Sequence, residues 1–188
     1  MNAPLMAIAA FCEGVLLDSG FADEAYARYA VEATYATTNL ATFKAIVKKY
    51  PRKPRESILR DLVASQPGNE GKWFAPAKDA GLFDLAIELA NRSPSDPRTL
   101  IRAARDFAVE RPEFALAAGI TALRGIANGW GYDITGIDVL DAYAAIMAAA
   151  CAAGVDEVVV KADVRELIAV TPNGGQFIQR MLERQLAD

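Results

Sequence analysis

The sequence predicts an all-α protein of about eleven helices, stacked as antiparallel pairs in an α-solenoid or an irregular helical bundle. Alanine dominates the 53% of residues that are hydrophobic, and it is the best helix former because it loses no side-chain entropy on ordering. Nine prolines and thirteen glycines mostly separate apolar periodic stretches, as residues that start or stop helices do. Alternating apolar and polar runs joined by two-residue turns, which would indicate an antiparallel sheet, do not occur.

Helix boundaries in the first half of the chain follow from capping residues, prolines and glycines. Pro4 suits the first turn of a helix, and Gly20 can end that helix in a left-handed conformation. Thr38 is expected to cap the third helix and Asn69 the fifth. The helices expected here cover residues 4–18, 22–36, 39–49, 54–66, 69–80 and 82–92.

Start signals in the second half are clearer. Asp96-Pro97 and Pro112 each begin a helix, and Thr135-Gly-Ile-Asp138 resembles a capping box with aspartate in the place of glutamate. Gly154 ends the helix that follows this box. One helix therefore starts at Asp96-Pro97, and others cover residues 112–128, 135–154, 156–170 and 175–186.

Apolar stripes indicate which helix faces are buried. In the helix that starts at Pro97, the buried stripe consists of Leu100, Ala104 and Phe107. In the helix after the capping box, it consists of Ile137, Leu140, Ala144, Met147 and Cys151. Small residues at 117–119 and at 122 should let a neighbouring helix approach closely.

The chain has no histidine, and its two cysteines, Cys12 and Cys151, lie far apart. Without histidine, zinc sites, histidine acid–base chemistry and the usual serine or cysteine triads lose an essential part. Disulfide frameworks need several cysteines at suitable spacings, so both cysteines are expected to be small buried residues. No phosphate-binding glycine loop or dinucleotide fingerprint occurs. We therefore expect a protein that is not an enzyme, with no cofactor and no metal.

The first seventeen residues look like a signal peptide only superficially. The first basic residue is Arg28, and Glu13 interrupts the apolar run. No stretch approaches the roughly 18 unbroken apolar residues of a membrane span. No low-complexity segment or long linker divides the chain. The expectation is a soluble, cytoplasmic protein in which residues 1–188 form a single domain.

Two segments of the chain align without gaps at an offset of 61 residues, 18–26 and 79–87, with Gly20 matching Gly81. At the same offset Thr38 matches Thr99 and Pro51 matches Pro112. Self-similarity at a fixed spacing is a signature of repeat architecture. It predicts an internal duplication of residues 18–51 and 79–112, whose two copies should superpose.

The stretch from Gly20 to Tyr29, Gly-Phe-Ala-Asp-Glu-Ala-Tyr-Ala-Arg-Tyr, resembles the turn and second helix of a tetratricopeptide-type repeat. In that family glycine makes the turn and alanine packs between helices. The resemblance covers half a motif and implies a related α-solenoid of irregular helix pairs. Residues 70–86 also look like helical carboxy-terminal regions of longer, uncharacterised bacterial proteins, which implies a module attached to something else.

The most concentrated charge in the sequence is a basic segment with six cations and no acidic residue, in a chain whose net charge is −4. Its location at a helix end and a proline-bracketed turn would suit phosphates or an acidic peptide. The alternative is a solvated corner whose lysines are favourably placed at a helix C-terminus. The cations of this basic segment are Lys44, Lys48, Lys49, Arg52, Lys53 and Arg55.

A second set of candidates for contact with a partner consists of three arginines. Arg98, Arg102 and Arg105 share one helix face and could pair with acidic groups of a ligand. Ordinary surface pairing, such as Arg102 with Asp106 four residues on, is the alternative. Asp138 is expected to act as a capping residue rather than in acid–base chemistry with Asp141, which should be solvated.

The aromatic side chains also allow two interpretations, contact with a partner or packing in the core. Trp130 and Tyr132 stand beside glycines in a loop that could expose them at a binding surface. Alternatively, Trp130 fills the gap between the helices on either side of that loop. Trp73 and Phe74 are expected to anchor the core.

These observations favour a binding or scaffolding module whose stacked helix pairs offer a surface to a protein or peptide partner. The second interpretation is an accessory domain that binds nucleic acid or another polyanion through the Lys44–Arg55 segment. No membrane association is expected. The identity of the partner and the oligomeric state do not follow from these patterns.

Overall fold

The computed structural model describes residues 3–187 of the chain and confirms the all-α fold. Within those residues it contains eleven α-helices, one 3-10 helix and no strand. The helices are α1 Ala3–Asp18, α2 Ala22–Ala33, α3 Asn39–Lys49, α4 Arg55–Ala64, η1 Glu70–Trp73 (3-10), α5 Phe74–Asp79, α6 Phe83–Arg92, α7 Pro97–Phe107, α8 Pro112–Ala127, α9 Gly136–Ala153, α10 Glu157–Ala169 and α11 Pro172–Leu186.

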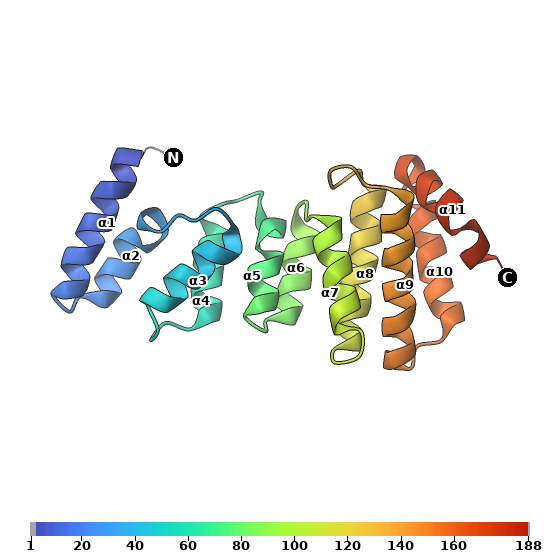
Figure 1. Cartoon of the computed structure of the whole chain (residues 1–188), viewed down its shortest axis with the longest axis horizontal. Coiled ribbons are helices and arrows are strands. Elements are labelled where there is room, and N and C mark those ends of the chain that lie inside the picture. The colour runs from blue at the N-terminus through green and yellow to red at the C-terminus, as the bar shows by residue number, and fades with distance from the viewer. Residues whose placement is uncertain (1–2, 188) are drawn as a thin grey trace.

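The helices form an elongated array that is compatible with a helical repeat. α1 and α2 lie at one end of the array, and α10 and α11 lie at the other (Figure 1). The turns α1–α2, α3–α4, α5–α6 and α7–α8 all lie along the lower edge in Figure 1. Surfaces at these turns therefore share one edge of the molecule.

Local signals placed most helix ends correctly. Thr38 caps α3 by accepting a hydrogen bond from the amide of Ala41 at 3.1 Å, and Asp96 accepts one from Thr99 at 3.0 Å. The predicted capping box is present, with the amide of Thr135 donating to the Asp138 carboxylate at 2.8 Å. These side chains satisfy amide groups that the helix itself leaves without partners.

The expected cap at Asn69 is wrong. The Asn69 side chain makes no capping hydrogen bond, and the segment starts as a 3-10 helix instead of an α-helix. Two buried serines hold that start: Ser93 accepts from the amide of Gly71 at 2.8 Å, and Ser95 donates to the Gly71 carbonyl at 2.9 Å. Only glycine fits here, since a Cβ would collide with the Ser93 carbonyl and Ser95. Contacts more than twenty residues away thus replaced the local cap.

Two helix ends also differ from expectation. α2 ends at Ala33 rather than at 36, because Thr34 is extended and buried and its hydroxyl accepts from Lys49. α11 begins at Pro172 rather than at 175. Proline at the first position of a helix loses no hydrogen bond, and its fixed φ suits the helix.

The centre of the core contains the expected anchors. Trp73 and Phe74 are 0% and 2% exposed. In α8, Gly119 lies so close to α9 that any side chain there would collide with Ile146. The predicted close approach at the small residues of α8 is therefore confirmed.

The predicted buried stripe of α9 is wrong. Ile137 and Leu140 are 69% and 38% exposed, and Ala144 and Cys151 are also exposed. The side that enters the core carries Val139, Ala142, Ile146, Ala149 and Ala150. α9 is apolar on all sides, so its periodicity could not distinguish the faces.

The cysteines also differ from expectation, since Cys151 is exposed and Cys12 is partly exposed. Among residues 3–187, α9 is the one helix with the length and mean hydropathy of a membrane span, although Asp138 and Asp141 interrupt its apolar run. Its packed side belongs to the core, as in central helices of soluble proteins.

Candidate functional site

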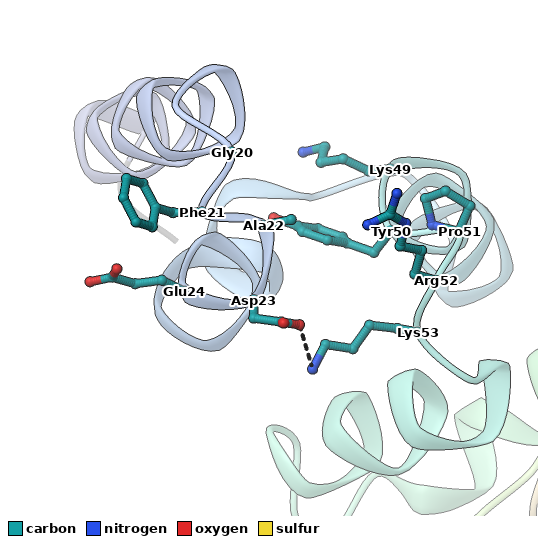
Figure 2. A pocket seen from close by; sticks show the side chains of 10 residues that line it. All are labelled: Gly20, Phe21, Ala22, Asp23, Glu24, Lys49, Tyr50, Pro51, Arg52 and Lys53. Atoms are coloured by element: carbon teal, nitrogen blue, oxygen red, sulfur yellow. Dashed lines mark ion pairs between the residues drawn. The ribbon is translucent and has the colours of Figure 1, made fainter.

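The most developed concavity lies between the α1–α2 turn and the α3–α4 turn, and we call it the first hollow. Its volume is about 640 Å³. In Figure 2 the two turns face each other, and the ring of Tyr50 reaches from one towards the other. The lining residues are Gly20, Phe21, Ala22, Asp23 and Glu24 from one turn and Lys49, Tyr50, Pro51, Arg52 and Lys53 from the other.

Backbone geometry positions both walls of the first hollow. Gly20 adopts a left-handed φ of 83°, which reverses the chain after α1. No side chain caps the start of α2. On the opposite wall, Tyr50 ends α3 while its amide still donates to the Ile46 carbonyl at 2.9 Å. Pro51 then prevents the helix from continuing.

A buried carboxylate joins α1 to the end of α3. Glu13 is 2% exposed and accepts hydrogen bonds from Lys49 Nζ at 2.7 Å and from the Tyr50 hydroxyl at 2.6 Å. Lys49 also donates to Thr34 at 3.2 Å. A carboxylate removed from water is costly unless it is paired and hydrogen-bonded, and here both conditions are met. Glu13, which interrupts the apolar run of α1, therefore has a structural role.

Two tyrosines continue this joint. The Tyr26 hydroxyl donates to Asp61 at 2.6 Å, and the rings of Tyr26 and Tyr50 meet edge to face with centroids 5.1 Å apart. Burial, followed by the hydrogen bond to a carboxylate, raises the pKa of each tyrosine well above its usual value of 10.0. Both hydroxyls therefore remain protonated donors at physiological pH.

Lys53 closes one side of the first hollow. Its ammonium lies 3.5 Å from Asp23 and 4.5 Å from the centre of the Tyr26 ring. Figure 2 shows the Asp23–Lys53 pair spanning the gap between the two turns. Because the Asp23 side chain is 97% exposed, this ion pair is weak. A ligand could replace it at little cost.

The structure divides the predicted basic segment. Lys44, Lys49 and Lys53 form ion pairs with Asp79, Glu13 and Asp23. Lys48, Arg52 and Arg55 are exposed and make no ion pair among residues 3–187. Of these three, only Arg52 lines the first hollow. Anion binding by the segment stays a prediction, with three free cations in place of six.

A second hollow occurs 61 residues further along the chain. Its volume is about 560 Å³, and residues 81–85 line it as residues 20–24 line the first, 61 positions earlier. Arg111, Glu113 and Phe114 correspond at the same offset to Tyr50, Arg52 and Lys53. The other lining residues are Glu56, Arg60 and Glu88.

The charges of the two hollows differ at matched positions. Asp84 corresponds to Asp23, but Phe114 stands where Lys53 would supply a partner. Arg52 is replaced by Glu113. Asp84 and Glu113 are exposed and make no ion pair among residues 3–187. The first hollow thus offers the guanidinium of Arg52 without an ion-pair partner. The second offers two such carboxylates beside the guanidinium of Arg111, which lies 5.2 Å from the centre of the Phe83 ring.

The offset of 61 does not hold at every predicted match. Thr38 caps α3, whereas Thr99 is the third residue of α7, which Asp96 caps. Pro51 lies in the turn before α4, and Pro112 is the first residue of α8. The superposition of the two units stays a prediction.

The arginines of α7 have partners in the structure. Arg98 binds Asp138 through Nε at 2.8 Å and Nη2 at 3.1 Å, and also donates to the Asp133 carbonyl. The pairing of Arg102 with Asp106 is wrong, since Asp106 pairs with Arg105 at 3.0 Å. The hydrogen bond from Arg98 is the largest cause that lowers the pKa of Asp138 to about 2. Arg98 therefore ties α7 to α9.

Trp130 is half-buried and lies against α8 rather than filling a sealed gap. A methyl group on Gly125 would stand 3.3 Å from Cε3 of Trp130 and 3.5 Å from Cγ of Pro97. Tyr132 is 85% exposed. The loop therefore presents Tyr132 to solvent, while Trp130 covers the end of α8. A contact of either ring with a partner stays a prediction.

The first hollow contains charged groups from both of its walls. Its charged groups are held by one another or exposed to solvent. Within residues 3–187 no group of three His, Cys, Asp or Glu side chains could hold a metal ion.

Comparisons with known proteins found no match: no protein-family model, no curated protein and no solved structure matches the chain. The kinship with tetratricopeptide-type repeats stays a prediction.

Proposed function

We propose that the chain is a non-enzymatic binding module that receives one peptide segment of a protein partner in the two hollows. The observation that carries the proposal is the recurrence of a hollow of similar size at the same offset in the chain. The turns that line both hollows lie along one edge of the array (Figure 1). A single extended segment could follow that edge, as ligands of repeat proteins follow a continuous surface.

The charges suggest the character of the peptide. Arg52 would attract an acidic residue to the first hollow, and Asp84 with Glu113 would attract a basic residue to the second. Apolar atoms of Phe21 and Pro51 in the first hollow, and of Phe83 and Phe114 in the second, would cover the peptide between its charges. The proposed ligand is therefore a segment of mixed charge. A cytoplasmic location is part of the proposal.

The test is selection of peptides from a display library of random sequences. We expect enriched sequences to carry an acidic residue some positions away from a basic one. The double variant Arg52→Glu with Asp84→Lys should lose these peptides or prefer the opposite order of charges. The matched control is Lys48→Glu, which changes an exposed cation outside both hollows. Selection without charge preference, or equal binding to the double variant, would contradict the proposal.

Binding of a polyanion is the second candidate, and the three free cations of the basic segment favour it. Contact with about three phosphates implies a logarithmic salt slope of roughly −2.7 on duplex DNA. The test is retention of the protein on heparin at low salt. Passage without retention would exclude this candidate and leave peptide binding unaffected.

A further inference from the structure

The first and last helices of the array have opposite surface character. The exposed residues of α11 are polar at the end marked C in Figure 1. They are Gln176, Gln179, Arg180, Glu183 and Arg184. At the other end, α1 exposes large apolar side chains. Leu5, Ile8, Phe11 and Val15 are 63%, 60%, 72% and 49% exposed. α1, the first helix of the array, thus exposes an apolar face, whereas α11 exposes a polar one.

The exposed side chains of α1 form one continuous stripe, which we call the α1 face. Residues 5, 8, 11, 12 and 15 follow the spacing of a single helix side. Glu13, the one charged residue between positions 3 and 17, lies on the opposite side and is buried. The α1 face therefore contains no charge. Contiguous apolar patches of this kind mark interaction sites.

We infer that the α1 face binds the same face of a second copy of the chain, with the two α1 helices antiparallel about a two-fold axis. This inference concerns a surface other than the two hollows and goes beyond the proposed function. A head-to-tail contact would place the α1 face on the charged residues of α11, which would leave them without water. The α1 face is complementary to itself, and a self-complementary patch generates a closed dimer.

The size and composition of the α1 face suit a dimer. α1 has 16 residues and is about 24 Å long. An interface of standard size buries roughly 800 Å² on each partner, with an apolar centre and a polar rim. The four large side chains supply the centre. The apolar Pro4 and Ala7, which are also exposed, extend this centre, and Asp18 supplies part of the polar rim.

Charge favours the antiparallel orientation. Asp18 is the last residue of α1, where a carboxylate is repelled by the negative end of its own helix dipole. α1 has no acidic residue in its first turn to complement the positive end. Antiparallel pairing brings Asp18 of each copy to the start of the other helix, and both helix ends then meet an opposite charge.

Sedimentation and light scattering test the dimer on the full chain. We expect twice the chain mass of 20.2 kDa for the wild type and a single chain mass for Ile8→Glu and for Phe11→Glu. The matched control is Val109→Glu, because Val109 is 84% exposed and lies outside the α1 face; it should remain a dimer. Circular dichroism verifies that each variant stays helical. A wild type that is monomeric at high concentration, or a dimer that survives both variants, would overturn the inference.

Disulfide trapping tests the orientation. In a background of Cys12→Ala and Cys151→Ala, antiparallel pairing places position 5 of one copy near position 15 of the other. A mixture of Leu5→Cys and Val15→Cys chains should then cross-link between the two variants, while neither variant cross-links alone, because a disulfide needs Cα atoms within about 7 Å. Cross-linking of Leu5→Cys with itself, or masses that keep growing with concentration, would refute an antiparallel closed dimer.

Discussion

Two junctions of this array are built in contrasting ways. The joint that attaches α1–α2 to α3–α4 depends on hydrogen-bonded side chains, with Glu13 held by Lys49 and Tyr50. The α8–α9 junction depends on small residues and shape, with Gly119 against Ile146. The first junction borders an open hollow, and at the second the side chain of Ile146 is fully buried. One row of helices thus combines an apolar block with a polar attachment next to its candidate binding site.

The energetic contrast follows from the kind of contact. Packing at α8–α9 depends on shape, so adding or removing one methylene group there changes the stability of the fold. A buried ion pair contributes less net stability than its short distances suggest, because removing the charges from water offsets much of the attraction. We therefore expect substitutions at α8–α9 to have the larger effects on stability.

The largest effect should come from Ile146→Ala. Ile146 is fully buried, and its truncation should lower the free energy of unfolding by roughly 2–5 kcal/mol through lost burial and an unfilled cavity. The control is Ile137→Ala in the same helix, where the side chain is 69% exposed and the change should stay within about 0.5 kcal/mol. Urea unfolding of the two variants measures both free-energy changes. Equal changes would indicate that Ile137 is buried, as the predicted stripe of α9 requires.

Gly119→Ala and Gly14→Ala should change stability in opposite directions. Alanine normally stabilises a helix relative to glycine by about 0.5–1 kcal/mol, and nothing lies within 4 Å of a Cβ on Gly14 in α1. At Gly119 the methyl group meets Ile146, and overpacking should cost roughly 1–3 kcal/mol. In an Ile146→Ala background, which removes the Cγ1 atom that the methyl group would meet, Gly119→Ala should cost less than it does in the wild type. Thermal unfolding that shows Gly119→Ala to be stabilising would mean that α8 and α9 are not in close contact.

At the polar joint, Glu13→Gln should cost about 1–2 kcal/mol, because Lys49 and Tyr50 lose a charged acceptor. Glu24→Gln is the matched control. It removes an exposed ion pair with Arg28 within one helix and should change stability by at most about 0.5 kcal/mol. A difference near zero between the two variants in chemical unfolding would show that the joint contributes no more than a surface pair.

The smallest effect concerns Asp138, the partner of Arg98 in the apolar block. Its pKa of about 2 in the folded state is below the usual value of 3.8, so the unfolded state binds more protons between these values. The contribution of Asp138, about 1 kcal/mol after allowance for solvent screening, should be present above pH 4 and lost as pH falls towards 2. Unfolding of the wild type and of Asp138→Asn should therefore converge at acid pH. A constant gap would indicate that the charge is not what stabilises the pair.

Local chemistry made most of the fold predictable. Thr135 with Asp138, Asp96 before Pro97 and Gly154 each determine a helix end within a few residues of themselves. The 61-residue offset also anticipated equivalent turns at Gly20 and Gly81, and the two hollows lie at those turns. The features that could be predicted were helix ends and turns, which depend on a residue and its neighbours in sequence.

The remaining features depend on distant contacts. The pairs Arg98–Asp138 and Lys44–Asp79 join residues 40 and 35 positions apart, and helical spacing rules address only residues three or four apart. In α9, alanine occurs on several sides of the helix, so the apolar residues have no clear periodicity that would distinguish the core face from the exposed face. The role of Glu13 had one signal in the sequence, a lone carboxylate within an apolar run, but its partners lie on another helix pair.

The polar joint has a further consequence for how the molecule opens. Breaking the contacts of Glu13 and Tyr26 frees α1–α2 without exposing the buried interior around Trp73 and Ile146. Units with few buried apolar contacts open at a smaller free energy than the whole domain. Amide protons of α2 should therefore exchange with deuterium through partial opening, while those of α8 and α9 should exchange only through global unfolding. The region beside the candidate binding site would then sample open forms far more often than the rest of the array.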